Sequence, residues 1–347
     1  MKIKYYEDFL SPTILSYLQR AATPVQEVED LYQIGDTSGL ENKESLSFLC
    51  ELYQILKPEL DIILKRRQKD RHFIDSRTKA LVQFNQEYKR DFLSPDYKTI
   101  FGLTDGDGRI VMGPFHDGYA ASGGNKISEI PDWFKGEHVT LFGPPDNAKL
   151  SINAMNAYHR KLPGEPAIVG DLLEKSDILP KWGADDEDSK TPLREDLISA
   201  GVNLTGCLEG TLEFEDSKKY SLAKEKLALP IKRFPGLALP SLFLFFKGEP
   251  LPLHLYDFVM HFFKNYKNKK ALAFYVPKLE NEEEARYIKL MLETAERMIQ
   301  KIDPQYEMHS IRLMIVLENP RAIFRVFYKC ILVNFTPSHI AQELFIH

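Results

Sequence analysis

Cysteine is scarce in this chain. Only three cysteines occur among 347 residues, at positions 50, 207 and 330, and they show no spacing typical of metal ligands. An odd and sparse set of this kind fits a reducing compartment better than a disulfide framework.

The chain also lacks a strong excess of either charge and any long apolar run. A net charge of −5 gives no reason to expect a general attraction to nucleic acid or acidic lipid. The longest apolar runs, such as 239–246, are far too short to span a bilayer, and the first residues have no apolar core typical of a secretory signal. We therefore expect a soluble intracellular protein, with no nucleic-acid partner and no membrane segment.

The first part of the chain is predicted to be helical. Phe48, Leu49, Leu52 and Leu56 recur at helical spacing within 45–56. Pro58 should end that helix and lie in the first turn of a second one that extends to about residue 75. The Gly-, Asp- and Ser-rich residues 102–130 predict a loop or small hairpin. Within them, TDGDGR lacks the remaining positions of a calcium loop and predicts a tight turn.

From residue 137, short strand-like runs alternate with amphipathic helices. Asp146 is a candidate N-cap for the first helix, and Asn281 with Glu284 resembles a capping box before the third. Alternation of this kind predicts an α/β fold with a parallel sheet covered by helices. The expected strands are 137–145, 178–188, 227–236, 271–279 and 311–319, and the expected helices are 149–162, 255–266 and 281–302.

Charged residues occur at the ends of several predicted strands, where parallel sheets usually carry their chemistry. Glu318 is either an oxygen ligand for a hard cation such as Mg²⁺, or a carboxylate that is exposed or paired with Lys or Arg. Arg233 either clamps a small carboxylate substrate or forms a structural ion pair. Lys278 is either a catalytic amine or a salt-bridge partner.

Four consecutive acids, Asp185, Asp186, Glu187 and Asp188, follow the second predicted strand. They form either a solvated loop or the rim of a site. If the strand extends through them, Asp185 and Glu187 share one face, and Asp186 and Asp188 share the other. Asp185 and Glu187 are therefore the candidate site residues of this run.

Several stretches, in this order, resemble blocks of the malate synthase family. Residues 48–75 resemble its N-terminal helical segment, and EHVTLFGPPDNAKLSINAMNA resembles a first strand with a Gly-Pro turn and a helix carrying Asn-Ala-x-Asn. GADDEDS is similar to the family's Ala-Asp-Phe-Glu-Asp-Ser, and KRFPGLAL lies where the family has Arg-Pro-Arg-Gly-Trp-His-Leu. GEPLPLHLYDFVMHFFKNY, FYVPKLENEEEAR and IRLMIVLENPRAIF resemble the helix and strands that follow.

The resemblance implies a TIM-type (β/α) barrel preceded by a helical clasp, divided here into 1–130, 131–326 and a divergent tail, 327–347. It also implies a Mg²⁺-dependent condensation of acetyl-CoA with glyoxylate, giving malate and CoA in the glyoxylate cycle. In such chemistry a metal polarises the aldehyde, an Arg stabilises the enolate and a carboxylate removes a methyl proton. By resemblance, Glu318 is a Mg²⁺ ligand and Arg233 is the enolate-stabilising Arg. Asp185 and Glu187 line the metal site and orient Arg233.

The chain departs from the family pattern at several positions. Asp186 replaces an aromatic residue, and Pro235 and Leu237-Ala238 replace the family's second Arg and its Trp-His. The resemblance stops after residue 326, and the family's second metal carboxylate and general base have no identified counterpart. Five predicted strands, with 329–335 as a candidate sixth, fall short of the eight of a closed barrel. We therefore expect an incomplete barrel in a C-terminally truncated relative.

Three functions stay open at this point: an active malate synthase-like enzyme, a non-catalytic or fragmentary relative, and a related Mg²⁺-dependent CoA-ester lyase. The expected location is cytoplasmic, or peroxisomal or glyoxysomal in a eukaryote. The final residues, FIH, are not a Ser-Lys-Leu type ending. The sequence leaves the oligomeric state open.

Overall fold

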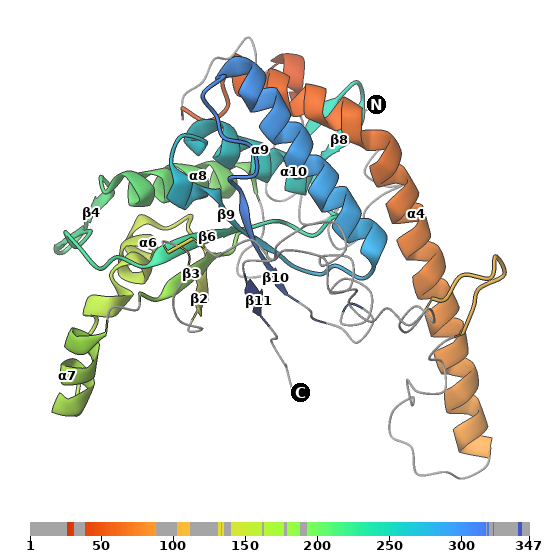
Figure 1. Cartoon of the computed structure of the whole chain (residues 1–347), viewed down its shortest axis with the longest axis horizontal. Coiled ribbons are helices and arrows are strands. Elements are labelled where there is room, and N and C mark those ends of the chain that lie inside the picture. The colour runs from red at the N-terminus through yellow and green to blue at the C-terminus, as the bar shows by residue number, and fades with distance from the viewer. Residues whose placement is uncertain are drawn as a thin grey trace.

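A six-stranded parallel sheet lies at the centre of the protein (Figure 1). Its strands are β2 (Thr140–Gly143), β3 (Lys181–Ala184), β6 (Leu229–Arg233), β9 (Ala273–Val276), β10 (Arg312–Val316) and β11 (His339–Ala341). The structure, a computed structural model, describes residues 26–30, 39–87, 103–111, 131–132, 134, 140–161, 163–176, 179–187, 193–316, 318, 322 and 339–341.

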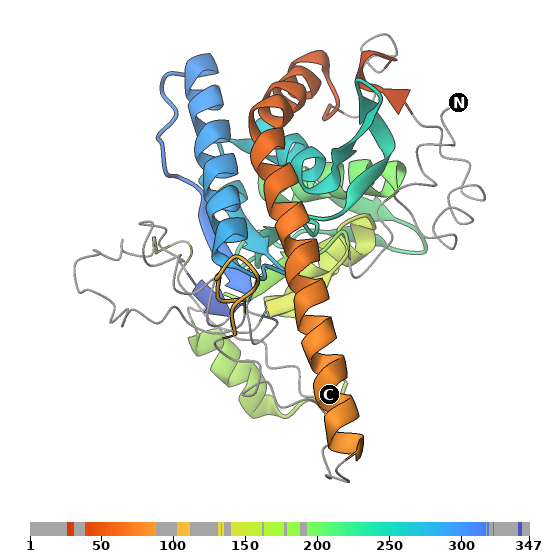
Figure 2. The same cartoon turned by 90° about the vertical axis from the view of Figure 1, so that its right-hand side faces the viewer.

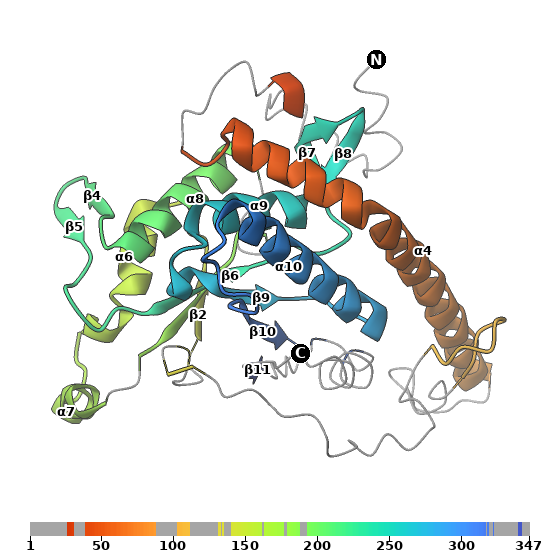
Figure 3. The same ribbon diagram turned by 45° about the horizontal axis from the view of Figure 1, so that its top comes forward.

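The order of the strands in the sheet is β11-β10-β9-β6-β3-β2, so neighbours in the sheet are also neighbours in chain order. Parallel strands need crossover connections, and these are almost always right-handed. A series of right-handed crossovers that always steps in one direction keeps its helices on one face of the sheet. In Figures 1 and 3 the connecting helices indeed lie on the same side. They are α6 (Ala148–Met155), α8 (Arg194–Glu209), α9 (Leu253–Asn265) and α10 (Glu282–Ile302). Helix α7 (Ala167–Lys175), which follows α6 in the connection from β2 to β3, lies apart from this layer in Figure 1.

The face of the sheet away from the helices is concave. The ring of Phe142 in β2 lies over Gly183 in β3, and its centroid is 5.6 Å from that of Tyr275 in β9. In a flat sheet, β2 and β9 would be about 14 Å apart, because two strands lie between them. The sheet therefore curls toward this face, although β2 and β11 remain its edges and the described residues form no closed barrel.

The predicted α/β fold with a parallel sheet is confirmed, and each predicted strand contains an observed one with tighter bounds. Strand β6 shows how the two faces differ. Lys232 points to the helix-covered side together with Phe274, its partner in β9, whereas Arg233 shares the concave side with Tyr275. The candidate sixth strand, 329–335, lies outside the described residues, as does Cys330.

The predicted break at Pro58 is wrong, because α4 (Lys43–Glu87) runs through this residue as a single helix of 45 residues. Proline removes the bond to the carbonyl of Gln54, but Gln54 is exposed, so water can solvate that carbonyl. Leu56 and Leu60, on either side of Pro58, are both buried, so packing holds the two halves together. The helix changes direction in its first half (Figure 2), as expected for a proline in a helix interior.

Two helix starts differ from the predictions in detail. Helix α6 is capped by Asn147 rather than by Asp146, because the Asn147 side chain accepts a hydrogen bond from the Leu150 N–H. This helix ends at Met155 and is followed by the short 3₁₀ helix η1 (Ala157–His159), instead of continuing to 162. At α10, Asn281 caps as predicted, but Glu284 accepts from the N–H of Glu280 rather than from that of the cap residue.

A second sheet was not predicted. It combines β1 (Gln26–Glu27), β7 (Pro240–Phe246) and β8 (Glu249–Pro252). The β7–β8 turn holds Lys247 and Gly248 at φ 53° and 80°, the two positive values that a type I′ hairpin requires. A small hairpin of β4 (Glu213–Glu215) and β5 (Lys219–Ser221) and the 3₁₀ helix η2 (Lys269–Leu272) complete the described elements.

The predicted tight turn at TDGDGR is confirmed. The Asp105 N–H donates to the Arg109 carbonyl, and the Asp105 carbonyl accepts from the Gly108 N–H. The Asp105 side chain accepts from the N–H groups of Asp107 and Arg109. Among the helices that the structure describes, none has the length and apolar character needed to cross a bilayer.

Candidate active site

The acidic run begins where β3 ends, at the carboxyl edge of the sheet. Asp185 and Asp186 are each only 6% exposed, so this part of the run is not a solvated loop. Asp185 and Glu187 turn to the concave face, and Asp186 turns to the helix-covered face, as predicted from alternation. The Asp185 side chain also accepts from the Glu187 N–H at 2.9 Å, which fixes the chain between the two acids. Asp188 lies outside the described residues.

Arg233, at the end of β6, joins the two acids of the concave face. Its Nη1 lies 2.6 Å from each Asp185 carboxylate oxygen, and its Nη2 lies 3.1 Å from a Glu187 oxygen. The Tyr275 ring centroid is 5.6 Å from the guanidinium carbon. Burial opposes the charge of Arg233, but the two carboxylates outweigh it and raise the pKa of the guanidinium. The structural ion pair predicted as one alternative for Arg233 is therefore present.

Glu187 is the bridge of this cluster. Besides Arg233, its carboxylate accepts a bond of 2.9 Å from the Gly236 N–H and one of 2.7 Å from Lys278 Nζ. Three loops that follow β3, β6 and β9 thus meet at one carboxylate. The salt bridge predicted as one alternative for Lys278 is confirmed.

Lys278 is held in a left-handed conformation, with φ 57°, which is unusual for a residue with a side chain. Its N–H donates to Glu318 Oε1 at 3.4 Å, so the segment after β10 reaches the same edge of the sheet. Glu318 itself is exposed. The structure thus brings all four predicted site residues, Asp185, Glu187, Arg233 and Glu318, to the carboxyl edge.

A second charged cluster lies on the opposite face, between the sheet and α9. Lys232 Nζ pairs with Asp186 and lies 2.8 Å from Asp257 Oδ2, and all three side chains are buried. Burial raises the pKa of Asp186 to about 7, with the Lys232 charge opposing the rise and the Asp257 charge adding to it. Burial likewise raises the pKa of Asp257.

Sequence analysis missed this second cluster. Its signal was a Lys inside the apolar run LALPIKRF and an Asp inside LHLYDFVMHFF. Charges within runs that are otherwise buried usually need a partner of opposite sign.

The residues at the carboxyl edge do not make a complete Mg²⁺ site on their own. Both oxygens of Asp185 accept from Arg233, and both oxygens of Glu187 accept from N–H donors. Within the described part of the chain, no group of three or more His, Cys, Asp or Glu side chains could hold a metal ion. Glu318 is the remaining candidate ligand, and a single carboxylate would leave the rest of an octahedral Mg²⁺ shell to substrate and water.

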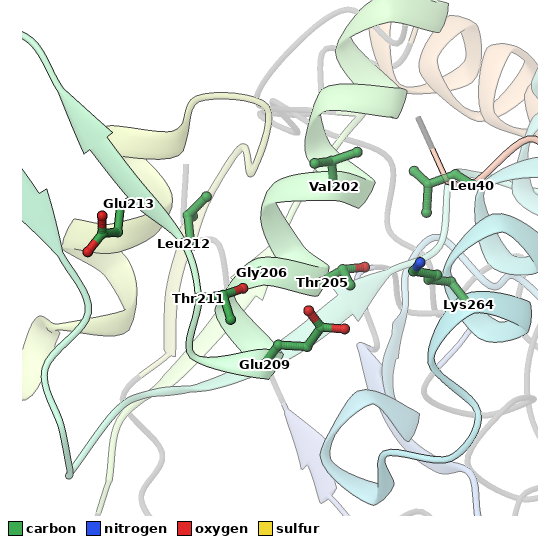
Figure 4. A pocket seen from close by; sticks show the side chains of 9 residues that line it. All are labelled: Leu40, Val202, Thr205, Gly206, Glu209, Thr211, Leu212, Glu213 and Lys264. Carbon is green, nitrogen blue, oxygen red and sulfur yellow. The ribbon is translucent and has the colours of Figure 1, made fainter. Parts of the chain in front are cut away.

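Two cavities of the described surface lie away from this edge. One, of about 430 Å³, is lined by the C-terminal half of α8, the residues that follow it, Leu40 and Lys264 (Figure 4). The other, of about 490 Å³, lies between the first turns of α4 and Phe246. Because α8 runs back from the carboxyl edge, its C-terminal end lies at the amino edge of the sheet, far from Arg233.

Comparison with known proteins identifies relatives of this chain. No protein-family model matches it. A stretch of 203 residues is 33% identical to "Malate synthase, glyoxysomal" of Gossypium hirsutum, and covers 55% of this chain and 31% of that protein. A longer stretch of 276 residues is 26% identical to "Malate synthase, glyoxysomal" of Ricinus communis, and covers 75% of this chain and 44% of that protein.

A bacterial relative extends the comparison. "Malate synthase A" of Escherichia coli (strain K12) is 32% identical over 168 residues, which are 47% of this chain and 27% of that protein. In each of these three comparisons the match spans less than half of the relative's own length. The plant and bacterial matches show that this chain is related to the malate synthases.

Proposed function

We propose that this chain carries the site of a malate synthase-like acyltransferase, which condenses acetyl-CoA with glyoxylate to give malate and CoA. One observation carries the proposal: Arg233 is clamped between Asp185 and Glu187 at the carboxyl edge of a parallel sheet. Active sites of such folds lie at this edge. The proposal includes a TIM-type barrel, of which the curled sheet is a part, and the division of the chain at residues 130 and 326.

In this proposal Arg233 stabilises the negative charge that develops on the enolate oxygen of acetyl-CoA. A fixed cation in a buried setting is more effective than one in water, because it needs no reorganisation when the charge appears. Asp185 orients the guanidinium through its two bonds to Nη1, and Glu187 holds it from Nη2. Asp185 and Glu187 thus act by fixing the direction of the Arg233 donors.

Lys278 is the more exposed of the two cations that Glu187 holds. The side chain of Arg233 is 1% exposed, whereas that of Lys278 is 35% exposed. An anionic substrate such as glyoxylate therefore meets the Lys278 ammonium first. Because Glu187 bonds to both cations, a shift of Glu187 toward Lys278 would open Nη2 of Arg233 to the substrate.

Mg²⁺ enters the proposal through the relatives and through Glu318, its predicted ligand. A peroxisomal or glyoxysomal location is part of the same proposal and rests on the plant relatives, whose names carry the word glyoxysomal.

One observation favours a second candidate, a relative that binds an anionic ligand without turning it over. The carboxylates of Asp185 and Glu187 are already engaged by Arg233, Gly236 and Lys278. Neither is therefore placed to remove a proton from acetyl-CoA without first leaving a cation.

Release of free thiol from acetyl-CoA, with glyoxylate and Mg²⁺ present, tests the proposal on protein shown to be folded by its cooperative thermal transition. The Arg233→Gln variant should lower kcat by about 10²- to 10³-fold, the usual loss when one oxyanion-stabilising donor is removed. The control is Arg66→Gln, which removes a partly exposed cation that pairs with Glu283. This variant should keep parental turnover.

The outcomes separate the candidates. Absence of thiol release from the folded parent contradicts the enzyme proposal. Glyoxylate binding by calorimetry in that same protein would then support the non-catalytic candidate. Cleavage of a malyl thioester to acetyl-CoA and glyoxylate without thiol release would indicate a CoA-ester lyase instead.

A further inference from the structure

The N-terminal helix α4 contacts the candidate site through one buried side chain. Arg67 is 6% exposed, and its Nε and Nη2 each lie 2.7 Å from an oxygen of Glu284, which is fully buried in the first turn of α10. Such a two-point pair fixes the plane of the guanidinium. Glu284 in turn accepts from the Glu280 N–H at 2.7 Å, so the pair also fixes the loop before α10.

The same guanidinium reaches the residue that carries the unusual backbone. Nη2 of Arg67 donates to the carbonyl oxygen of Lys278 at 3.0 Å. Both backbone polar groups of Lys278 are therefore held by side chains from other segments, the C=O by Arg67 and the N–H by Glu318. A left-handed conformation at a non-glycine residue costs free energy and persists where its surroundings impose it.

The left-handed turn determines where the Lys278 side chain points. From this backbone its Nζ reaches Glu187 at 2.7 Å, and Glu187 holds Nη2 of Arg233. A relaxed backbone at residue 278 would turn the Cα–Cβ bond away from that direction. The chain of contacts runs from α4 through Arg67, Lys278 and Glu187 to Arg233.

We infer that Arg67 is a positioning residue: by holding the Lys278 carbonyl, it keeps the left-handed turn and aims the Lys278 ammonium at Glu187. The inference deepens the proposed function, because it makes the N-terminal helix part of the site. Arg67 touches no substrate atom and acts only through Lys278.

A neighbouring pair provides a matched control. Arg66 and Glu283 join the same two helices one residue earlier on each, with Arg66 Nη1 2.5 Å from Glu283 Oε1. Among the residues that the structure describes, this pair makes no hydrogen bond to Lys278. The test pair is Arg67→Met with Glu284→Gln, and the control pair is Arg66→Met with Glu283→Gln. Gln at 284 keeps an oxygen that can accept from the Glu280 N–H, and each double variant removes one charge of each sign.

The readout is the rate of acetylation of the Lys278 amine by acetic anhydride, measured by mass spectrometry relative to Lys267, whose side chain is 72% exposed. Loss of the Lys278–Glu187 bond should raise Lys278 labelling by about threefold to fivefold in the test pair, a typical effect of losing a partly exposed ion pair. The control pair should stay within about 1.5-fold of the parent. Unchanged Lys278 labelling in a folded test pair overturns the inference.

A single variant covers the case in which the test pair does not fold. Arg67→Lys keeps a positive charge against Glu284, but an ammonium cannot make the planar two-point pair and also hold the Lys278 carbonyl. It should therefore fold and still raise Lys278 labelling, and parental labelling in this variant also overturns the inference. If the parent shows no turnover, the proposed function fails while the labelling result still decides the inference. If the parent is active, both Arg67 variants should lower kcat by about tenfold, the scale of effects of remote misplacement.

Discussion

On each of the two faces of β3 and β6 a buried cation pairs with two carboxylates, but the two clusters differ in their exposure to solvent. On the concave face, Arg233 is held by Asp185 and Glu187, and Lys278 opens the cluster toward solvent. On the helix-covered face, Lys232 is enclosed by Asp186 and Asp257, and none of the three side chains is more than 6% exposed. Residues adjacent in sequence thus belong to an accessible cluster and to a sealed one.

The contrast also explains a departure from the family pattern. Asp186 stands where the family has an aromatic residue, and the structure pairs it with Lys232 and places both beside Asp257. A charge introduced into a core is tolerated only with a partner, so the departure is compensated locally. The sealed cluster supports the fold, while the open cluster is the one that the proposed function uses.

The largest predicted effect breaks the sealed cluster. Lys232→Met leaves two buried carboxylates without their cation, and should lower the free energy of unfolding by about 3–5 kcal/mol. Urea unfolding followed by circular dichroism measures this loss. Lys149→Met removes an exposed cation from Asp216 and should leave the urea midpoint close to that of the parent, because solvent screens an exposed pair.

Removal of the whole sealed cluster should be far milder than removal of its cation. Asp186→Leu, Lys232→Met and Asp257→Leu together leave no buried charge, and the triple variant should lie within about 2 kcal/mol of the parent. A triple variant as unstable as Lys232→Met alone would show that packing, not charge, decides the stability of this region.

The next effect is a pH dependence of the free energy of unfolding, which should arise from Asp186 on the helix-covered face. The pKa of Asp186 is raised from 3.8 to about 7, so between these values the folded protein holds a proton that the unfolded chain has lost. The Asp186 contribution to stability is therefore present below about pH 4 and is lost as the pH rises to about 7. The parent's stability relative to Asp186→Asn should fall across this range, as measured by urea unfolding at several pH values. A constant difference would contradict the raised pKa.

A smaller effect concerns packing on the concave face. Gly183→Ala places a Cβ 2.5 Å from two ring atoms of Phe142, which must move from its position near Tyr275. Because Phe142 is 42% exposed, its ring can shift, and the cost should be about 1 kcal/mol by thermal unfolding. Gly143→Ala meets nothing within 4 Å and should be close to neutral. Equal losses in both variants would mean that Phe142 does not lie over Gly183.

The smallest effect on stability belongs to Glu318→Gln, since Glu318 is exposed and its bond to the Lys278 N–H is 3.4 Å long. The midpoint of thermal unfolding should change by less than about 2 °C, as for an exposed polar substitution. If Glu318 is a metal ligand as predicted, calorimetric Mg²⁺ affinity should fall by at least about tenfold. An unchanged affinity would remove Glu318 from the proposed site.

Local rules predicted the arrangement of the accessible cluster but not that of the sealed one. The alternation of side chains along a strand predicted that Asp185 and Glu187 lie on the face opposite to Asp186. The position of Arg233, Lys278 and Glu318 at the ends of predicted parallel strands indicated that they lie at one edge of the sheet. Asp257 is contributed by a helix, and which helix residue meets Lys232 depends on how α9 packs on the sheet. The prediction of a helix break at Pro58 was wrong for the same reason, because tertiary packing of α4 outweighs a local helix-breaking preference.

The strand order of the main sheet has a consequence for biosynthesis. The six strands of the main sheet lie side by side in the order in which they occur in the chain. Each new strand can therefore pair with an edge that is already present. The chain emerges from the ribosome at about 5–20 residues per second, slowly compared with local folding. The sheet can therefore grow during translation without any strand waiting for a later one to be inserted beside it. At each stage the surfaces open to wrong pairing are the edge of the newest strand and the outer edge of β2.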